Sequence, residues 1–367
     1  MPHTWSQALA WRLGRQLLEP VGTESTVDVV RRLGAVPAQS DPAAELAVRT
    51  RRQRSRPGEV ERALAEGSLI KTFAFRGATH LMTPEEGSAY LALRAASRMW
   101  ERKSWQSYYG LTSSDWPVFR QTVREALDDG PLTHDELGAA ITARPDYRHL
   151  DSVFAEGAYT LLKPLAWQGD LCFGPPRDGR ATFQRLDTNP CWPGLPELDD
   201  AGMRAVAAYL RTYGPATADR IHYWLGEGLG AGRRRIQSWI TALGDRLAVV
   251  ELEGEPTYVM DEDLEGLSAA TATTALRLLP GHDQWVLGPG TADAHVVPPS
   301  RRALVTRGAN LVTTGGVVSG TWAVNGDQVT VAWFAEAGPA PQDALDQEVD
   351  RLATILGRPV RGDVRTA

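Results

Sequence analysis

An internal repeat constrains the fold of this chain more than any other feature of its sequence. The segments VREALDDGPLTHDELGAAI (123–141) and VAAYLRTYGPATADRIHYWL (206–225) share one pattern. In each segment an apolar-periodic helix ends at Gly-Pro, a threonine follows, an acidic residue stands two positions later, and a second amphipathic helix begins. Thr133 and Thr217 fit the N-cap position, because a threonine hydroxyl can accept a hydrogen bond from a free amide at a helix start. Each copy therefore predicts a helix, a tight turn and a second helix, the front half of a helix-turn-helix unit.

The residues that follow each copy predict a β-hairpin. After the first copy and a further helical stretch, the strand-like runs LCFG and ATFQRL flank a turn. After the second copy, LAVVELEG and PTYVM are separated by a similar turn. A hairpin that follows three helices is a wing, so we expect winged helices over residues 112–195 and 196–268. Residues 1–111 predict a third, more diverged copy that ends in a connecting helix.

The last part of the chain, residues 269–367, predicts a different domain. It is rich in Val, Thr and Gly in short alternating runs, and Asn325-Gly326 between two such runs is a strong hairpin signal. A final helix is expected over PQDALDQEVDRLATILG. The sequence thus predicts an α+β protein with three tandem winged helix-turn-helix units and a β-rich C-terminal domain.

The distribution of charge is more informative than its sum. The chain carries 39 Lys and Arg against 45 Asp and Glu, a net charge of −6, which argues mildly against a nucleic-acid binder. Arginines nevertheless gather in three places: RTRRQRSR (49–56), GRRRIQSW (232–239) and PPSRRALVTR (298–307). Phosphate binding needs only a local field, so these clusters favour a shared anionic partner as much as they favour solvated surfaces.

Several classes of protein are excluded by missing motifs. The chain has no apolar run long enough for a membrane span and no signal-peptide pattern, so we expect a cytoplasmic protein. Two cysteines make neither a disulfide framework nor a zinc site, and the seven histidines lack HExxH spacing. P-loop, GxGxxG and GxSxG motifs are absent. We therefore expect no metal and no cofactor.

Five segments carry a resemblance to a known family: LAWRL, VVRRLGAVPAQSDPAAELAVR, FRGATHLMTPEE, YGPATADRIHYWLG and LRLLPGHDQWVLG. Together, and in this order, they resemble the AlkZ/YcaQ-type winged-helix DNA glycosylases over nearly the whole chain. The resemblance implies three winged helices around a concave DNA-binding face. It also implies base excision of bulky N7-alkylated guanine from double-stranded DNA, including interstrand cross-links made by DNA-alkylating antibiotics, and a role in self-resistance. We expect a monomer.

The resemblance points to one catalytic residue. The family motif is Gln, an apolar residue, then Gln or Asp, and it falls where Pro37 to Gln39 stand here. Gln39 carries over in the AlkZ-like form, whereas Pro37 departs from the motif because it has no amide side chain. An N7-alkylated guanine is already cationic and needs no general acid, so the remaining task is to place water against an oxocarbenium-like sugar. The carbonyl of Gln39 can orient that water, while its amide holds a phosphate or a second water.

The expected DNA contacts are basic residues on the wings, the arginine clusters and the C-terminal domain. They are Arg51, Arg52, Arg54, Arg76, His80, Arg233, Arg234, Arg235, Arg301 and Arg302. The Arg233 cluster starts a helix where helix-turn-helix proteins contact DNA, although a solvated helix start is the alternative. Arg301 and Arg302 follow VVPP in an expected hairpin, and the resemblance suggests that this hairpin enters the minor groove. Arg76 and His80 can equally belong to an exposed hairpin with local hydrogen bonds.

His282 and Asp283, within LLPGHDQW, are weaker candidates for catalysis or support. An aspartate in such a turn is more often a structural or capping carboxylate. Two other functions stay open at this stage. One is a non-catalytic DNA-binding protein of the same fold, either a regulator or an inactive paralogue. The other is a protein-interaction scaffold, which fits the net charge of −6 but leaves the arginine clusters without a role.

Overall fold

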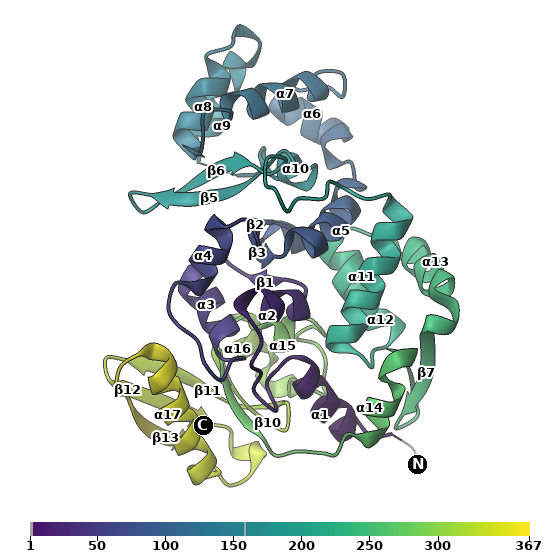
Figure 1. The fold of residues 1–367 in the computed structure, drawn as a ribbon, viewed down its shortest axis with the longest axis vertical. Coiled ribbons are helices and arrows are strands. Elements are labelled where there is room, and N and C mark those ends of the chain that lie inside the picture. The colour runs from purple at the N-terminus through teal and green to yellow at the C-terminus, as the bar shows by residue number, and fades with distance from the viewer. Residues whose placement is uncertain (1–2, 158) are drawn as a thin grey trace.

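The computed structural model describes residues 3–157 and 159–367 (Figure 1). Three units repeat one order of elements, and a five-stranded sheet follows them. Figure 1 places the second unit at one end of the molecule, the C-terminal sheet at the other, and the first and third units between them. No helix within the described ranges is long and apolar enough to cross a bilayer.

The first unit begins at the second helix of the chain. Its elements are α2 (Thr26–Leu33), β1 (Val36–Pro37), α3 (Asp41–Arg49), α4 (Glu59–Ala65), β2 (Ile70–Phe73) and β3 (Thr79–Met82). The sheet order is β1-β3-β2, so the hairpin β2–β3 is the wing and β1 is an edge strand. Helix α2 is amphipathic: Val29, Val30 and Leu33 are buried in a core shared with α3 and α4.

The first helix of the chain packs outside the core of α2, α3 and α4. Helix α1 (Trp5–Arg15) buries Leu9 and Leu13 against the C-terminal sheet, and it buries Trp5 and Ala8 against the third unit. Its apolar periodicity predicted a helix correctly, but periodicity does not say which partner covers the apolar face. Helices α5 (Pro84–Ala95) and α6 (Lys103–Tyr109) connect the first unit to the second.

The second unit repeats the order of the first. Its elements are α7 (Trp116–Ala126), β4 (Leu132–Thr133), α8 (His134–Thr142), α9 (Asp151–Ala155), α10 (Lys163–Trp167), β5 (Leu171–Arg177) and β6 (Arg180–Arg185). The sheet order β4-β6-β5 matches that of the first unit. Thr133 forms a full capping box with Glu136 at the start of α8, which confirms the predicted cap.

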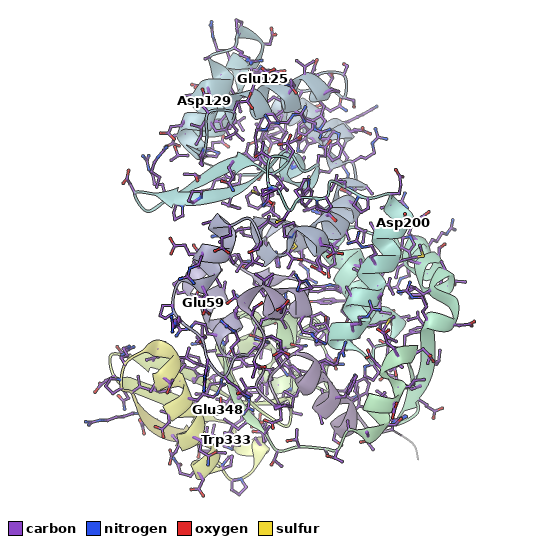
Figure 2. All side chains as sticks on the ribbon, in the orientation of Figure 1. Glu59, Glu125, Asp129, Asp200, Trp333 and Glu348 are labelled. Carbon is purple, nitrogen blue, oxygen red and sulfur yellow. The ribbon has the colours of Figure 1, made fainter. Side chains whose placement is uncertain are left out.

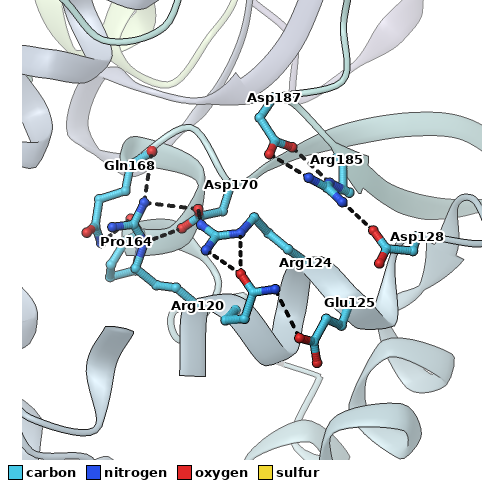
Figure 3. Close-up of polar contacts among 10 residues, drawn as sticks. Arg120, Arg124, Glu125, Asp128, Pro164, Gln168, Asp170, Arg185 and Asp187 are labelled. Carbon is cyan, nitrogen blue, oxygen red and sulfur yellow. Dashed lines mark hydrogen bonds and ion pairs between the residues drawn. The ribbon is translucent and has the colours of Figure 1, made fainter. Parts of the chain in front are cut away.

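A buried carboxylate ties the first helix of this unit to its wing (Figure 3). Asp170 accepts hydrogen bonds from Arg120, at 2.6 and 3.0 Å, and from Arg124 at 2.5 Å. Its side chain is 2% exposed. In the same view Arg185 of β6 pairs with Asp128 and Asp187. These arginines are therefore neutralised by structural partners.

The third unit has the same order with a shorter first strand. It comprises α11 (Leu198–Tyr213), α12 (Ala218–Ile221), a π-helical turn (His222–Glu227), α13 (Arg233–Leu243), β7 (Leu247–Leu252) and β8 (Glu255–Met260). Ala216 bridges Tyr258 of β8, so a single residue replaces the first strand. Thr217 caps α12 by accepting from the Arg220 amide, as predicted. One hydrophobic core runs from Ala35 to Met260, so the units share a core, and the range limits given above stay predictions.

The C-terminal part forms a sheet of order β13-β12-β11-β10-β9. Its elements are α14 (Leu264–Ala269), β9 (Leu276–Leu279), α15 (Gln284–Leu287), α16 (Arg302–Thr306), β10 (Asn310–Thr314), β11 (Val317–Asn325), β12 (Gln328–Trp333), α17 (Gln342–Leu356) and β13 (Arg361–Thr366). Alternate residues face opposite sides: Leu278 and Val312 contact the core under α17, whereas Leu279 and Leu311 contact α1. The sheet is thus covered by a helix on each face.

Two local predictions for this domain have different outcomes. The hairpin at Asn325-Gly326 is confirmed, with Asn325 paired to Gln328, and Gly326 takes the left-handed conformation at φ 60°. The hairpin expected around Arg301 and Arg302 is wrong. Those residues lie in a 3-10 turn (Pro299–Arg301) and at the start of α16, because two prolines fix the entry to a short helix instead of a strand.

Candidate nucleic-acid interface

Gln39 lies at the end of edge strand β1, immediately before α3. The Ala38 amide donates to the Thr79 carbonyl of β3 at 2.8 Å, and Ser40 caps α3 by accepting from Ala43. Between these two fixed residues, Gln39 is exposed, and its side chain has no hydrogen-bond partner within the described residues. Its amide therefore presents a free carbonyl and a free NH₂ group to solvent from a rigid backbone.

The backbone before Gln39 is held from behind by two other parts of the chain. The buried Gln284 side chain of α15 donates to the Ala35 carbonyl. The Tyr213 hydroxyl of α11 donates to the Leu33 carbonyl at 2.9 Å and is itself buried. Residues from the third unit and the C-terminal part thus fix the segment that carries Gln39.

Asp283 and Arg51 form a buried ion pair behind the same segment. Asp283 accepts from Arg51 at 2.6 and 2.9 Å and also caps α15 by accepting from the Trp285 amide at 2.8 Å. Both side chains are fully buried. A guanidinium inside the protein cannot reach a phosphate, so the predicted DNA contact of Arg51 is corrected, and Asp283 is a structural carboxylate. His282 beside it is exposed, with φ at 58°.

The two candidates on the first wing differ in position. His80 of β3 is 4% exposed and bonds the Ala78 carbonyl through Nδ1 at 3.0 Å. Burial lowers the pKa of His80 to about 4, so the ring is neutral and inside the unit. Its predicted DNA contact is therefore corrected. Arg76 is exposed at the turn of the wing, with its guanidinium 4.4 Å from the Tyr223 ring centroid and 3.8 Å from Glu227.

The arginine-rich segment after α3 is a turn, and its members have separate roles. Arg52 pairs with Glu59, labelled in Figure 2, and donates to the Glu24 carbonyl at 2.8 Å, so it holds the turn against α4. Arg54 and Arg56 are exposed and have no polar partner among the described residues. They line a groove of about 680 Å³ between this turn and α17. Only these outer arginines are available to an anion.

The other two clusters show the same division between paired and free cations. Arg233 pairs with Asp219 at 2.8 Å at the exposed start of α13, whereas Arg234 and Arg235 are exposed without a partner in the described ranges. Arg301 pairs with Glu336 at 2.6 Å, an interaction that lowers the pKa of that carboxyl to about 2, and it lies over the Phe334 ring. Arg302 is exposed and unpaired by the same criterion.

Two cations that the sequence did not single out lie beside the first wing. Arg94 on α5 and Lys163 on α10 are half-buried, and no carboxylate within the described chain pairs with either. They are isolated in the sequence and belong to different units, so no local pattern marks them. Only the packing of α10 against α5 and β2 brings them together. No three His, Cys, Asp or Glu side chains in residues 3–157 and 159–367 are arranged to hold a metal ion.

The first wing lies between two projecting parts of the molecule. In Figure 1, the β5–β6 hairpin and the α17–β12 edge both extend beyond α3 and α4 on the same side. Gln39 precedes α3 and its cap Ser40, and the arginine turn follows α3. The free amide of Gln39 and the free Arg54 and Arg56 thus flank α3, on the side where the two elements project, whereas Arg234 and Arg235 lie on α13, away from it.

Comparisons with known proteins identify the family of the chain. The family model "DNA glycosylase AlkZ-like" matches residues 30–355. An interstrand DNA cross-link repair glycosylase of Streptomyces sahachiroi is 36% identical over 363 residues, which cover 97% of this chain and 98% of that protein. The solved structure of the Streptomyces sahachiroi DNA glycosylase AlkZ superimposes with a TM-score of 0.93 at 35% identity, and the match covers all of both chains.

Proposed function

Because this chain belongs to the AlkZ-like DNA glycosylase family, we propose that it is a monofunctional glycosylase in which Gln39 positions the attacking water. Its substrate is double-stranded DNA carrying a bulky N7-alkylguanine or an interstrand cross-link. The observation that supports this proposal most strongly is the position of Gln39. Its side chain is exposed and unpartnered within the described residues, while the backbone on both sides is hydrogen-bonded in place.

The chemistry of the substrate suits a neutral amide. When the C1′–N9 bond of an N7-alkylated guanine breaks, its electron pair neutralises the cationic base, so no proton donor is required. The sugar gains positive charge, and water adds to C1′ and releases a proton. The carbonyl of Gln39 can accept a hydrogen bond from that water and face the developing cation, while the NH₂ group can hold a phosphate. A carboxylate would be a stronger base, so a single Gln suits an activated leaving group.

The main proposed DNA contacts are exposed arginines with no carboxylate partner among the described residues. They are Arg54, Arg234, Arg235 and Arg302. We assign Arg52, Arg76, Arg233 and Arg301 a lesser part, because each already lies within 4 Å of a carboxylate. We further propose that the protein acts as a monomer, which sedimentation on and off DNA tests. Its biological role would be self-resistance to a DNA-alkylating natural product, tested by survival of a sensitive host that expresses it.

The catalytic assignment is tested by incubating the protein with a duplex that contains N7-methylguanine and cleaving the product with alkali. We expect abasic product from the unaltered chain and a loss of at least about 100-fold in rate for Gln39→Ala, since the water loses its main anchor. Duplex binding and the melting temperature should change little, because Gln39 is exposed. Full activity of the variant would place the catalyst elsewhere.

Pro37 favours a second candidate function, a DNA-binding protein that does not hydrolyse. Pro37 of β1 pairs with His80 of β3 and has no side-chain amide to hold a second water. The same assay separates the candidates. Tight, salt-dependent binding with no abasic product on any alkylated duplex would favour the non-catalytic protein, whereas no binding at low salt would leave only a protein-interaction role.

A further inference from the structure

Two half-buried cations lie where three units meet, beside the first wing. Lys163 is the first residue of α10, and a β-carbon placed on Gly77 would lie 3.4 Å from its Nζ. Arg94, near the end of α5, extends toward Gly230 of the third unit, where a β-carbon would lie 3.2 Å from its Nη1. Both side chains are half-buried.

Neither cation is neutralised by a neighbouring acid. Arg94 Cζ lies 4.2 Å from the Trp167 ring centroid, and its Nε is buried without a hydrogen-bond partner. Lys163 Nζ lies 5.6 Å from the Phe73 ring centroid. Burial, and then the charge of Arg94, lower the pKa of Lys163, while burial and Arg102 lower the pKa of Arg94. The two charges therefore repel each other in a partly desolvated place, where the described residues offer them the faces of Trp167 and Phe73 but no carboxylate partner.

Three other partly buried arginines of the chain pair with carboxylates, whereas Arg12, which is fully buried, has no ion pair within the described residues. Arg120 and Arg124 share Asp170, and Arg277 pairs with Glu348, which is labelled in Figure 2. Cation–π contacts stabilise a charge only modestly, and they do not remove like-charge repulsion. Leaving Arg94 and Lys163 without a carboxylate is therefore explained best by an anion that arrives from outside.

The position of the pair identifies the kind of anion. Gly77 is in the turn of the first wing, two residues before Thr79, and the Thr79 carbonyl binds the Ala38 amide next to Gln39. Strands lie about 4.8 Å apart and advance about 3.3 Å per residue, so the pair is on the order of 10 Å from Gln39. One strand of DNA advances about 3.4 Å per nucleotide, so that distance corresponds to about three nucleotides.

We propose that Arg94 and Lys163 form a binding site for a single backbone phosphate of the DNA strand that flanks the lesion. The phosphate provides the negative charge that the pair lacks and sets the register of the strand relative to Gln39. Because α5 and α10 come from different parts of the chain, the site also fixes how the first and second units sit against bound DNA. This inference rests on the proposed function, since it takes DNA as the partner.

Its first test uses binding, so that it does not depend on catalysis. The probe is a duplex with one tetrahydrofuran residue, a stable analogue of the abasic product, and the dissociation constant is measured over a series of salt concentrations. We expect Lys163→Gln and Arg94→Gln each to reduce the salt slope by about 1. Lys103→Gln is the matched control, because Lys103 also begins a helix but is exposed, and its slope should equal that of the unaltered chain.

The second test locates the phosphate. Single phosphates near the tetrahydrofuran are replaced in turn by uncharged methylphosphonates. One replacement should weaken binding to the unaltered chain, and that same replacement should have no further effect on the double variant of Arg94 and Lys163. Additive losses at every position, or salt slopes equal to the Lys103→Gln control, would overturn the proposal.

The outcomes are distinguishable from failure of the proposed function. A chain that makes no abasic product but shows the slope changes keeps the phosphate site and loses the glycosylase. If the unaltered chain excises the base but the variants leave the salt slope unchanged, the glycosylase function is kept and the phosphate site is lost. If Arg94→Gln does not fold, Arg94→Lys retains the charge and Lys163→Gln alone still decides the question.

Discussion

His80, buried in the first wing, makes the stability of the protein depend on pH in a way that can be tested. The folded pKa of about 4 lies below the ordinary value of 6.5, so the unfolded chain takes up a proton first as the pH falls. Stability is therefore unaffected above pH 6.5 and decreases between pH 6.5 and 4, by roughly 3 kcal/mol if the full difference applies. We expect His80→Asn, which cannot ionise, to flatten this part of a plot of unfolding free energy against pH. The free energy of unfolding is measured by urea titration at pH 7 and at pH 4.5. If it falls as much in His80→Asn as in the unaltered chain, His80 is not the titrating group.

The buried ion pair between Arg51 and Asp283 leads to a second prediction about a single residue. Both side chains are fully buried, and removing one partner leaves a charge without compensation. Asp283→Asn should lower the free energy of unfolding by about 3–5 kcal/mol. Asp187→Asn is the matched control, because Asp187 pairs with Arg185 near the surface and should lose no more than about 1 kcal/mol. If denaturant titrations show the same loss of unfolding free energy for both substitutions, burial does not make the Arg51–Asp283 pair more costly to break.

At the scale of elements, β1 is an edge strand that tolerates proline and leads directly to the proposed catalytic residue, Gln39. Pro37 lacks an N–H group, which is acceptable at an edge, but it also lacks the amide that the family motif places there. Pro37→Gln should raise the rate of base excision, because a second amide can hold the water, and should leave the strand paired with β3. The measurement is single-turnover excision of N7-methylguanine, with Gln39→Ala/Pro37→Gln as the inactive control. A lower rate would mean that the proline contributes to the geometry of Gln39.

The sequence predicted helix starts and turns correctly where a few adjacent residues determine them. Thr133 and Thr217 cap helices as expected, and the Asn325-Gly326 hairpin forms, because caps and turns depend on a few adjacent residues. The apolar periodicity of α1 predicts a helix, but it does not say which part of the chain covers the apolar face. Less of the candidate site could be predicted from the sequence, because it depends on contacts between residues that are far apart in the chain. Arg51 sits among surface arginines in the sequence, and only the approach of Asp283, 232 residues away, takes it inside. Arg94 and Lys163 are isolated basic residues in the sequence, and only the packing of α10 against α5 brings them together.

At the scale of the whole molecule, the two ends of the chain depend on each other. Leu9 and Leu13 of α1 are buried against the C-terminal sheet, and Arg51 in the first unit is neutralised by Asp283 beyond it. A fragment of residues 1–268 would expose that apolar face and leave a buried guanidinium uncompensated, although it contains all three winged units. We therefore expect the fragment to lack the near-ultraviolet circular dichroism and cooperative unfolding of the full chain. Co-expression with residues 269–367 should restore both signals, because it returns the missing partners. A fragment that unfolds cooperatively by itself would show that the shared core of the three units suffices, and that the C-terminal sheet is an accessory to the segment that carries Gln39.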